Sequence, residues 1–137
     1  MYGDTAAGRK RVAQLREQSG DIRALATRLV SQAEAVPWHG KAAEAMRERI
    51  RERAGHLRAV AAQHDTAADS LAAHLVEVDR LKEAIDVRSR KATTLVEDAR
   101  TRTSQGAADD GGDAPLLAFD PPPAGHRDWP TVELPGL

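Results

Sequence analysis

The sequence predicts an all-α fold, an antiparallel helical hairpin with a long second helix, and three observations support this. Alanine accounts for 26 of the 137 residues and only four residues are aromatic, a composition that favours closely packed helices over a sheet. Apolar residues recur at alternating steps of three and four along two stretches, which is the spacing of an amphipathic helix. Pro37 separates the two stretches, and proline ends a helix because it cannot donate the next backbone hydrogen bond.

The first helix is expected over residues 5–36, with Asp4 or Thr5 as its N-cap. Gly20 is a local weakness of about 1 kcal/mol relative to alanine. Because proline disfavours helical geometry in the preceding residue, Val36 is expected to be the last helical residue. The apolar seam of this helix consists of Val12, Leu15, Ser19, Ile22, Ala26, Leu29, Ala33 and Val36.

The second helix is expected over residues 41–103, after a turn at 37–40. No proline interrupts it, and Gly55 and the polar stretch 63–70 mark the places where it would bend or break. Arg53 and Arg88 fall on its apolar stripe, where their stems are expected to lie across the seam with their charges in water. The seam consists of Ala43, Met46, Ile50, Leu57, Val60, His64, Ala67, Leu71, His74, Val78, Leu81, Ile85, Ala92, Leu95 and Ala99.

The two helices are unequal in length, about 48 and 90 Å at a rise of 1.5 Å per residue. A four-residue turn makes them antiparallel neighbours, so the first helix covers only the first half of the second. The seam from about Leu71 onward is therefore expected to have no cover within the chain. Dimerisation into a four-helix bundle with another hairpin would bury both stripes. The expected partner interface consists of Leu15, Ile22, Leu29, Ile50, Leu57, Leu71, Val78 and Ile85.

Residues 105–137 are expected to form a flexible, disordered tail. They hold six of the seven prolines and have six acidic residues against one arginine, whereas residues 1–104 have 19 basic and 15 acidic residues. Flexibility is expected above all in residues 107–114. A loose electrostatic fold-back onto the helices is an alternative, and salt would weaken it. Phe119 and Trp129 are too apolar for a pure linker, so they form a candidate docking motif for a partner.

Several classes of function are not expected. The sequence has no cysteine, no membrane-spanning apolar run and no recognisable set of catalytic residues, and residues 1–11 contain no apolar run of the signal-peptide type. Sec-type export, membrane insertion and enzymatic activity are therefore not expected. His64 and His74 are ten residues apart and cannot form the i, i+4 pair of a helical zinc site, so no metal or other cofactor is expected. Glutamates interrupt the arginines of residues 41–60 and no stacking aromatic accompanies them, which argues against nucleic-acid binding.

The turn reads Val36-Pro37-Trp38-His39-Gly40 and lies between a helix of about thirty residues and an alanine-rich amphipathic helix. This arrangement resembles the Esx-like family of small type VII secretion substrates of actinobacteria and related bacteria, which is named after its Trp-x-Gly turn. The resemblance covers residues 1 to about 100 and places Trp38 and Gly40 in the loop. It implies a homodimeric or heterodimeric four-helix assembly. It also implies export by the type VII machinery without a cleaved signal peptide, and hence a secreted or cell-envelope location.

The sequence departs from the family at the export signal, Tyr-x-x-x-Asp/Glu, which follows the core of the second helix. The nearest spacing here is Lys82 and Asp86, and the single tyrosine is Tyr2. We therefore expect a partner to supply the signal, or the chain to be the cytoplasmic companion of a secreted protein. The expected function is that of a secreted substrate or co-secreted helper that pairs with another helical hairpin or with the N-terminus of an effector. The alternatives are a cytosolic coiled-coil adaptor or chaperone, and a DNA-associated helical protein.

Overall fold

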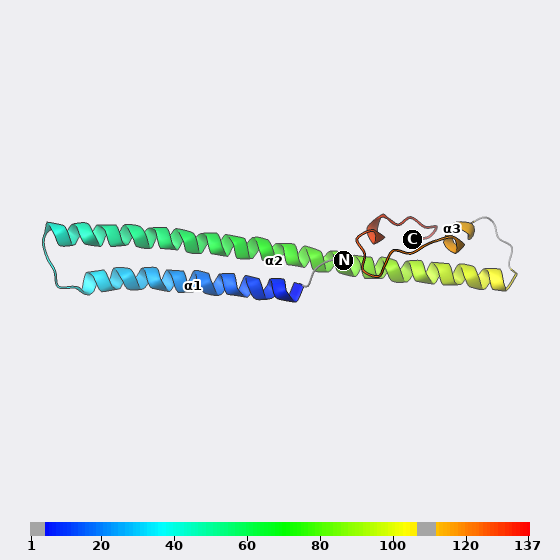
Figure 1. Cartoon of the computed structure of the whole chain (residues 1–137), viewed down its shortest axis with the longest axis horizontal. Coiled ribbons are helices and arrows are strands. Elements are labelled where there is room, and N and C mark those ends of the chain that lie inside the picture. The colour runs from blue at the N-terminus through cyan, green and yellow to red at the C-terminus, as the bar shows by residue number, and fades with distance from the viewer. Residues whose placement is uncertain (1–4, 107–111) are drawn as a thin grey trace. The chain divides into compact units, whose positions relative to one another are not determined.

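The structure is a computed structural model that describes residues 5–106 and 112–137, and its regular elements are all helical. Helix α1 (Thr5–Ala35) and helix α2 (Lys41–Ser104) are joined by residues 36–40 (Figure 1). The short helix α3 (Ala114–Leu117) and the 3-10 helix η1 (Trp129–Thr131) follow. The prediction of an all-α chain with two long helices and a short linker is confirmed, and the bounds of both helices lie within one residue of the expected ones.

Helix α2 runs without a break through Gly55 and residues 63–70, where the sequence allowed a bend. Helix α1 likewise continues through Gly20. Of the two expected N-caps, Asp4 lies outside the described residues, and Thr5 is the first helical residue and is buried. Residues 107–111 of the expected flexible segment also lie outside the described part of the chain.

The chain divides into two packing units, and α2 takes part in both. One unit, the hairpin, is Thr5–Leu75 and contains α1 with the first part of α2. The other unit contains the described residues from Val76 onward, that is, the rest of α2 and residues 112–137. This division differs from the expected one after residue 104, because residues 112–137 pack against α2.

Small side chains form the contact between α1 and α2. The two helices also approach each other closely at Gly8 of α1, where an added Cβ atom would lie 2.5 Å from a methyl carbon of Leu75 of α2. Because the contacting side chains are so small, the two backbones come close together and large side chains remain at the margins of the contact. The residues at most 1% exposed in the hairpin are Ser19, Ala26, Ala43, Ala54, Ala61 and Ala68.

Within the hairpin, the expected seam of α2 is confirmed for one of its two series of residues and is wrong for the other. The series Ile50, Leu57, His64 and Leu71 is partly buried, as expected. The second series is displaced by one residue: Ala54, Ala61, Ala68 and Leu75 are buried, whereas the expected Met46 and Val60 are 49% and 40% exposed. The physical reason is that α1 approaches α2 on the side where alanines recur every seven residues, since these permit the closer contact.

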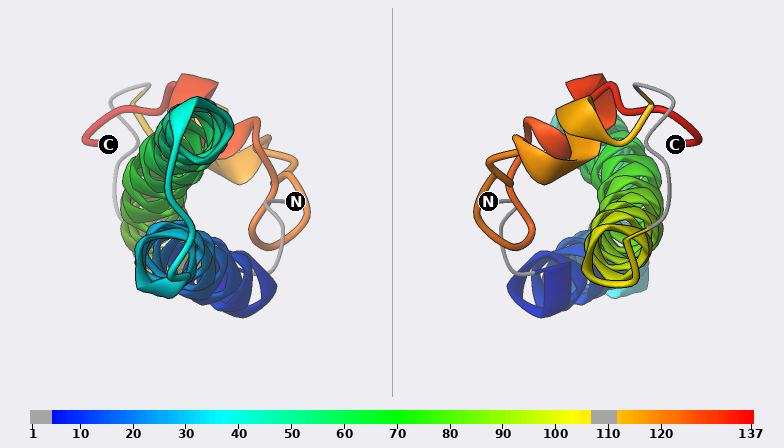
Figure 2. Two further views of the ribbon diagram at one scale, coloured as in Figure 1. Left: turned by 90° about the vertical axis from the view of Figure 1, so that its left-hand side faces the viewer. Right: turned by 90° about the vertical axis from the view of Figure 1, so that its right-hand side faces the viewer.

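Residues 112–137, which we call the strap, fold back along the second half of α2, where the sequence predicted a flexible tail (Figures 1 and 2). Trp129 and Leu116 are each 3% exposed, and Trp129 meets Phe119 edge to face with ring centroids 6.2 Å apart. The α2 residues buried under the strap are Ile85, Ala92, Val96 and Ala99. Ile85 therefore does not face a partner in this structure, because the chain's own strap covers it.

Polar contacts fix the strap at both ends. The guanidinium of Arg88 donates hydrogen bonds to the backbone carbonyls of Trp129 and Val132, so its charge is not left in water as expected. Arg102 forms a two-pronged ion pair with Asp113 at 2.9 and 2.6 Å, and its hydrogen bond lowers the pKa of that carboxyl. Apolar burial together with these few charged contacts explains the fold-back better than general charge attraction does.

Candidate partner interface

The contact between α1 and α2 is closed along one side by ion pairs, and we call this side the polar edge. Arg23 lies 2.6 Å from Asp65, and Arg16 lies 3.3 Å from Asp69. The Arg23 guanidinium also donates to the hydroxyl of the buried Ser19 at 2.6 Å. The two ion pairs link α1 to α2, and the contact with Ser19 lies beside them within α1. The polar edge therefore fixes how α1 and α2 lie side by side.

The pKa of Asp65 lies below its usual value. A hydrogen bond from Ser19 is the largest cause and a hydrogen bond from Arg23 is the next, while desolvation acts in the opposite direction. Because these donors stabilise the ionised carboxylate, the polar edge is strongest when Asp65 is charged.

The opposite side of the same contact, which we call the apolar edge, carries large side chains that the hairpin covers only in part. Leu15, Ile22 and Leu29 of α1 are partly buried, as are Ile50, Leu57 and Leu71 of α2. Further large apolar side chains of the hairpin are 40–50% exposed. These are Leu25, Val36, Trp38, Met46 and Val60. On a helix of heptad period, Met46 and Val60 flank the Ile50 and Leu57 line on the side away from Ala54 and Ala61, so all these residues share one edge.

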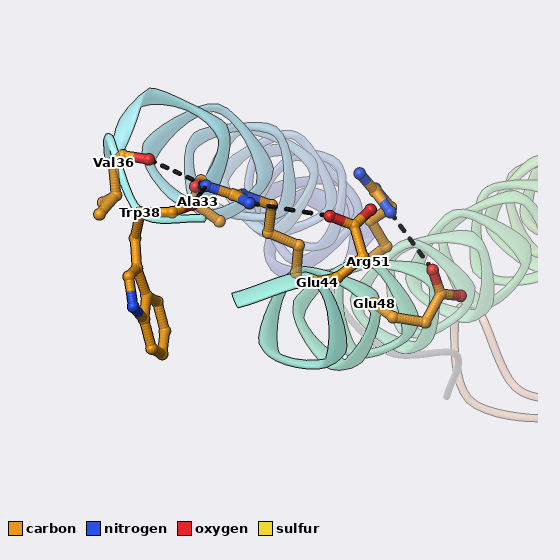
Figure 3. Close-up of polar contacts among 7 residues, drawn as sticks. Ala33, Val36, Trp38, Glu44, Glu48 and Arg51 are labelled. Carbon is orange, nitrogen blue, oxygen red and sulfur yellow. Dashed lines mark hydrogen bonds and ion pairs between the residues drawn. The ribbon is translucent and has the colours of Figure 1, made fainter. Parts of the chain in front are cut away.

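Arg47 holds the turn at the tip of the hairpin. Its Nε atom donates to the carbonyl of Ala33 at 3.2 Å, and a terminal nitrogen donates to the carbonyls of Val36 at 2.9 Å and Trp38 at 2.6 Å (Figure 3). The last carbonyls of a helix have no partner within the helix and carry partial negative charge, so a guanidinium is a suitable cap. The side chain of Arg47 is only 16% exposed.

Gly40 gives the turn the conformation from which α2 starts. Its φ is +107°, a value that side-chain-bearing residues rarely adopt. Its carbonyl accepts a hydrogen bond from the backbone amide of Glu44 at 3.0 Å, which forms the first turn of α2. Gly40 is therefore required by the backbone, and the turn places Trp38 at the end of the apolar edge.

Trp38 is 45% exposed, and its ring points away from the polar contacts of Arg47 (Figure 3). The ring lines a groove of about 250 Å³ at the tip of the hairpin, together with apolar residues of both helices. Other residues lining this groove include Leu29, Val36, Ala43, Met46 and Ile50. The groove is the tip end of the apolar edge, and its walls are mostly apolar side chains.

The structure divides the residues that the sequence marked for binding into three groups. Six of the eight expected interface residues lie along the apolar edge. Val78 and Ile85 belong to the other unit, where Val78 is partly buried and Ile85 is 1% exposed. Phe119 and Trp129 dock, but they dock on the chain's own α2. The capping role of Arg47 was not predicted from the sequence, although the position of an arginine shortly after the turn, on the face of α2 that contacts α1, could have indicated it.

Comparison with protein-family models, with curated proteins and with solved structures finds no match. Within the described ranges, no helix is long and apolar enough to cross a membrane, and no group of three or more acidic, histidine or cysteine side chains is placed to hold a metal ion. The outstanding feature of the hairpin is thus the apolar edge with Trp38 at its tip.

Proposed function

We propose that this chain is a recognition module that pairs its hairpin with a second helical chain, as an Esx-like type VII secretion substrate or co-secreted helper. The observation that carries the proposal is the asymmetry of the hairpin. Ion pairs close the polar edge, while large apolar side chains stay partly exposed along the whole apolar edge. A contiguous exposed apolar surface of this kind is typical of a protein contact site.

Pairing along the apolar edge has a clear source of free energy. Burying the remaining exposed surface of a half-covered large apolar side chain contributes about 1 kcal/mol. Five such side chains of the edge are 40–50% exposed, and six more are partly exposed. Their combined burial supplies enough free energy for a specific complex once the entropic cost of association is met.

The setting of Trp38 and Gly40 supports the secretion part of the proposal. Both residues occupy the connection between two long antiparallel helices, and Trp38 lies at the end of the surface that a partner would cover. Because the stretch around Lys82 and Asp86 lacks the tyrosine of the export signal, the partner would carry that signal and the two chains would leave the cell together.

The test has two arms. Light-scattering mass of the purified chain, alone and co-expressed with the product of the neighbouring gene, is expected to show a complex that Leu57→Glu disrupts. Arg58→Glu serves as the matched control, since residue 58 lies on the polar side of α2. Secretion predicts the protein in the culture filtrate and its loss from the filtrate when the type VII ATPase is removed. A strictly monomeric chain that never pairs would contradict the proposal.

A cytosolic coiled-coil adaptor or chaperone is the second candidate, and the missing tyrosine signal is the observation that favours it. It would use the same apolar edge and the same pairing. The two candidates separate in the second arm of the test: an adaptor pairs in solution but stays in the cell whether or not the ATPase is present.

A further inference from the structure

Basic residues line the outer margin of the apolar edge, and we call this margin the rim. On α2, Arg53 lies three residues after Ile50 and four before Leu57, so it projects on the same side as Met46 and Val60. Arg49 and His56 occupy the next positions outward. Arg49, Arg53 and His56 line one surface hollow, in which Glu52 is the single carboxylate.

The carboxylates that form ion pairs within the hairpin lie on its other side. Asp65 and Asp69 pair with arginines of α1 at the polar edge, and Glu48 pairs with Arg51. By contrast, neither Arg49 nor Arg53 takes part in an ion pair with any described residue. The ion pairs of the hairpin therefore lie on the polar side, whereas the charges of Arg49 and Arg53 beside the apolar edge remain available to a partner.

The rim of α1 adds little negative charge. The positions immediately outward of Leu15, Ile22 and Leu29 carry no acidic side chain; they are Arg11, Gln18, Leu25 and Gln32. The next positions outward are Gln14, Asp21 and Arg28, of which one is acidic and one is basic. A second copy of the chain would therefore bring one net basic rim against another, because the rim arginines outnumber its carboxylates. The arginines are Arg11, Arg28, Arg49 and Arg53, and the carboxylates are Asp21 and Glu52. In a two-fold dimer the same surface meets itself, so the arginines in excess would find no carboxylates to pair with.

We propose that the apolar edge binds an amphipathic helical partner whose own apolar stripe is flanked by carboxylates, and not a second copy of this chain. This inference rests on the proposed pairing function and adds the chemistry of the partner. Carboxylates beside the partner's stripe would meet Arg49 and Arg53 at the rim, where opposite charges select the partner and set its register. Like-charged rims at the same time disfavour self-association.

The test uses two synthetic helical peptides with identical leucine and isoleucine stripes. One carries glutamate at every flanking position and the other carries lysine, and their like-charged flanks keep each peptide from pairing with itself. Binding to the full chain is measured by titration calorimetry. The glutamate peptide is expected to bind at least about tenfold more tightly than the lysine peptide at low salt, and the preference is expected to shrink as salt rises.

Charge reversal at the rim sharpens the test. The double variant Arg49→Glu, Arg53→Glu is expected to lose about tenfold in affinity for the glutamate peptide and to gain affinity for the lysine peptide. The matched control is Arg51→Glu, Arg58→Glu, which makes the same change of charge on the polar side of the same helix. The control is expected to bind both peptides as the unchanged protein does, and circular dichroism checks that all variants stay helical.

The outcomes separate this inference from the proposed function. Equal binding of both peptides would overturn the proposal of an acidic partner but leave the pairing function standing. A stable homodimer that neither peptide disrupts would have the same consequence. Binding to phosphatidylglycerol vesicles in preference to the glutamate peptide would overturn both, because the edge would then be a lipid-contact surface. Failure of the chain to bind either peptide, to dimerise or to pair with any co-expressed helical chain would likewise overturn both.

Discussion

Replacing Arg47 with methionine should destabilise the hairpin although the residue is distant from most of the core. The guanidinium donates to the carbonyl of Ala33 in the last turn of α1 at 3.2 Å, and to the carbonyls of Val36 and Trp38 in the following connection at 2.9 and 2.6 Å. Methionine keeps most of the side-chain volume and removes all three donors. Ala33 is partly buried, so its carbonyl would lose its guanidinium partner in a place that water reaches poorly, whereas Val36 and Trp38 are exposed and their carbonyls can turn to water.

The expected loss follows from this difference. A hydrogen bond to a charged group contributes about 1.5–3 kcal/mol where water cannot replace it, and much less where water can. One part-buried bond and two replaceable ones give a loss of about 2 kcal/mol in the free energy of unfolding. The ion pair with Glu44 adds little, since its atoms are 3.9 Å apart and the Glu44 side chain is 74% exposed.

The measurement is urea unfolding of the full chain followed by circular dichroism at helical wavelengths. Arg51→Met is the matched control, because Arg51 makes only an exposed pair with Glu48 at 3.2 Å, for which we expect about 0.5 kcal/mol or less. Arg47→Lys should fall between the two, since it keeps the charge near the end of α1 and loses the forked donors. Equal stability of Arg47→Met and Arg51→Met would refute the capping argument.

Three further predictions follow from burial and charge. Ala61→Leu, at a fully buried contact, should lower the free energy of unfolding by about 1–3 kcal/mol. Ala62→Leu, at an exposed position, should change this free energy little. Trp129→Ala should release the strap, seen as faster hydrogen exchange in residues 112–137 with unchanged exchange in α1, because about 3 kcal/mol of burial is lost. The pKa of Asp65 lies below 3.8, and the hydrogen bond from Ser19 is the main cause. The ionised Asp65 carboxylate should therefore contribute its full stabilisation above pH 3.8 and lose it as the pH falls through the lower pKa of the folded protein. The melting temperatures of the unchanged protein and Asp65→Asn should accordingly converge in acid.

Helix positions were predictable from the sequence because proline and heptad spacing act locally. Pro37 ends the first apolar stretch and Gly40 starts the next, so both helices begin and end close to the expected residues. The side of α2 that meets α1 was harder to predict. Met46 and Val60 are larger than Ala54 and Ala61, and hydrophobicity alone favours the larger residues. The actual contact forms through the smaller ones, since only they permit the backbones to approach closely.

A loose electrostatic fold-back of the tail was one alternative, but the ordered packing of the strap was not predicted, because it depends on contacts distant in sequence. Proline, glycine and acidic residues predict a flexible segment when it is considered alone. What orders it is the fit of Trp129 and Leu116 onto α2 and the two carbonyls bound by Arg88. Arg88 looked like an interruption of the seam, yet its donors satisfy the backbone of a segment more than forty residues later.

The use of alanine at the helix contact bears directly on the proposed pairing of the hairpin with a partner. An alanine buries a single methyl group, so Ala54, Ala61 and Ala68 bring the helices together without contributing much hydrophobic free energy. The side chains able to contribute more, such as Leu57, stay partly exposed on the apolar edge. A ligand that binds only the folded state stabilises that state in proportion to its affinity and concentration. The small residues therefore set the geometry of the hairpin, and the proposed partner would supply further stabilisation by covering the apolar edge.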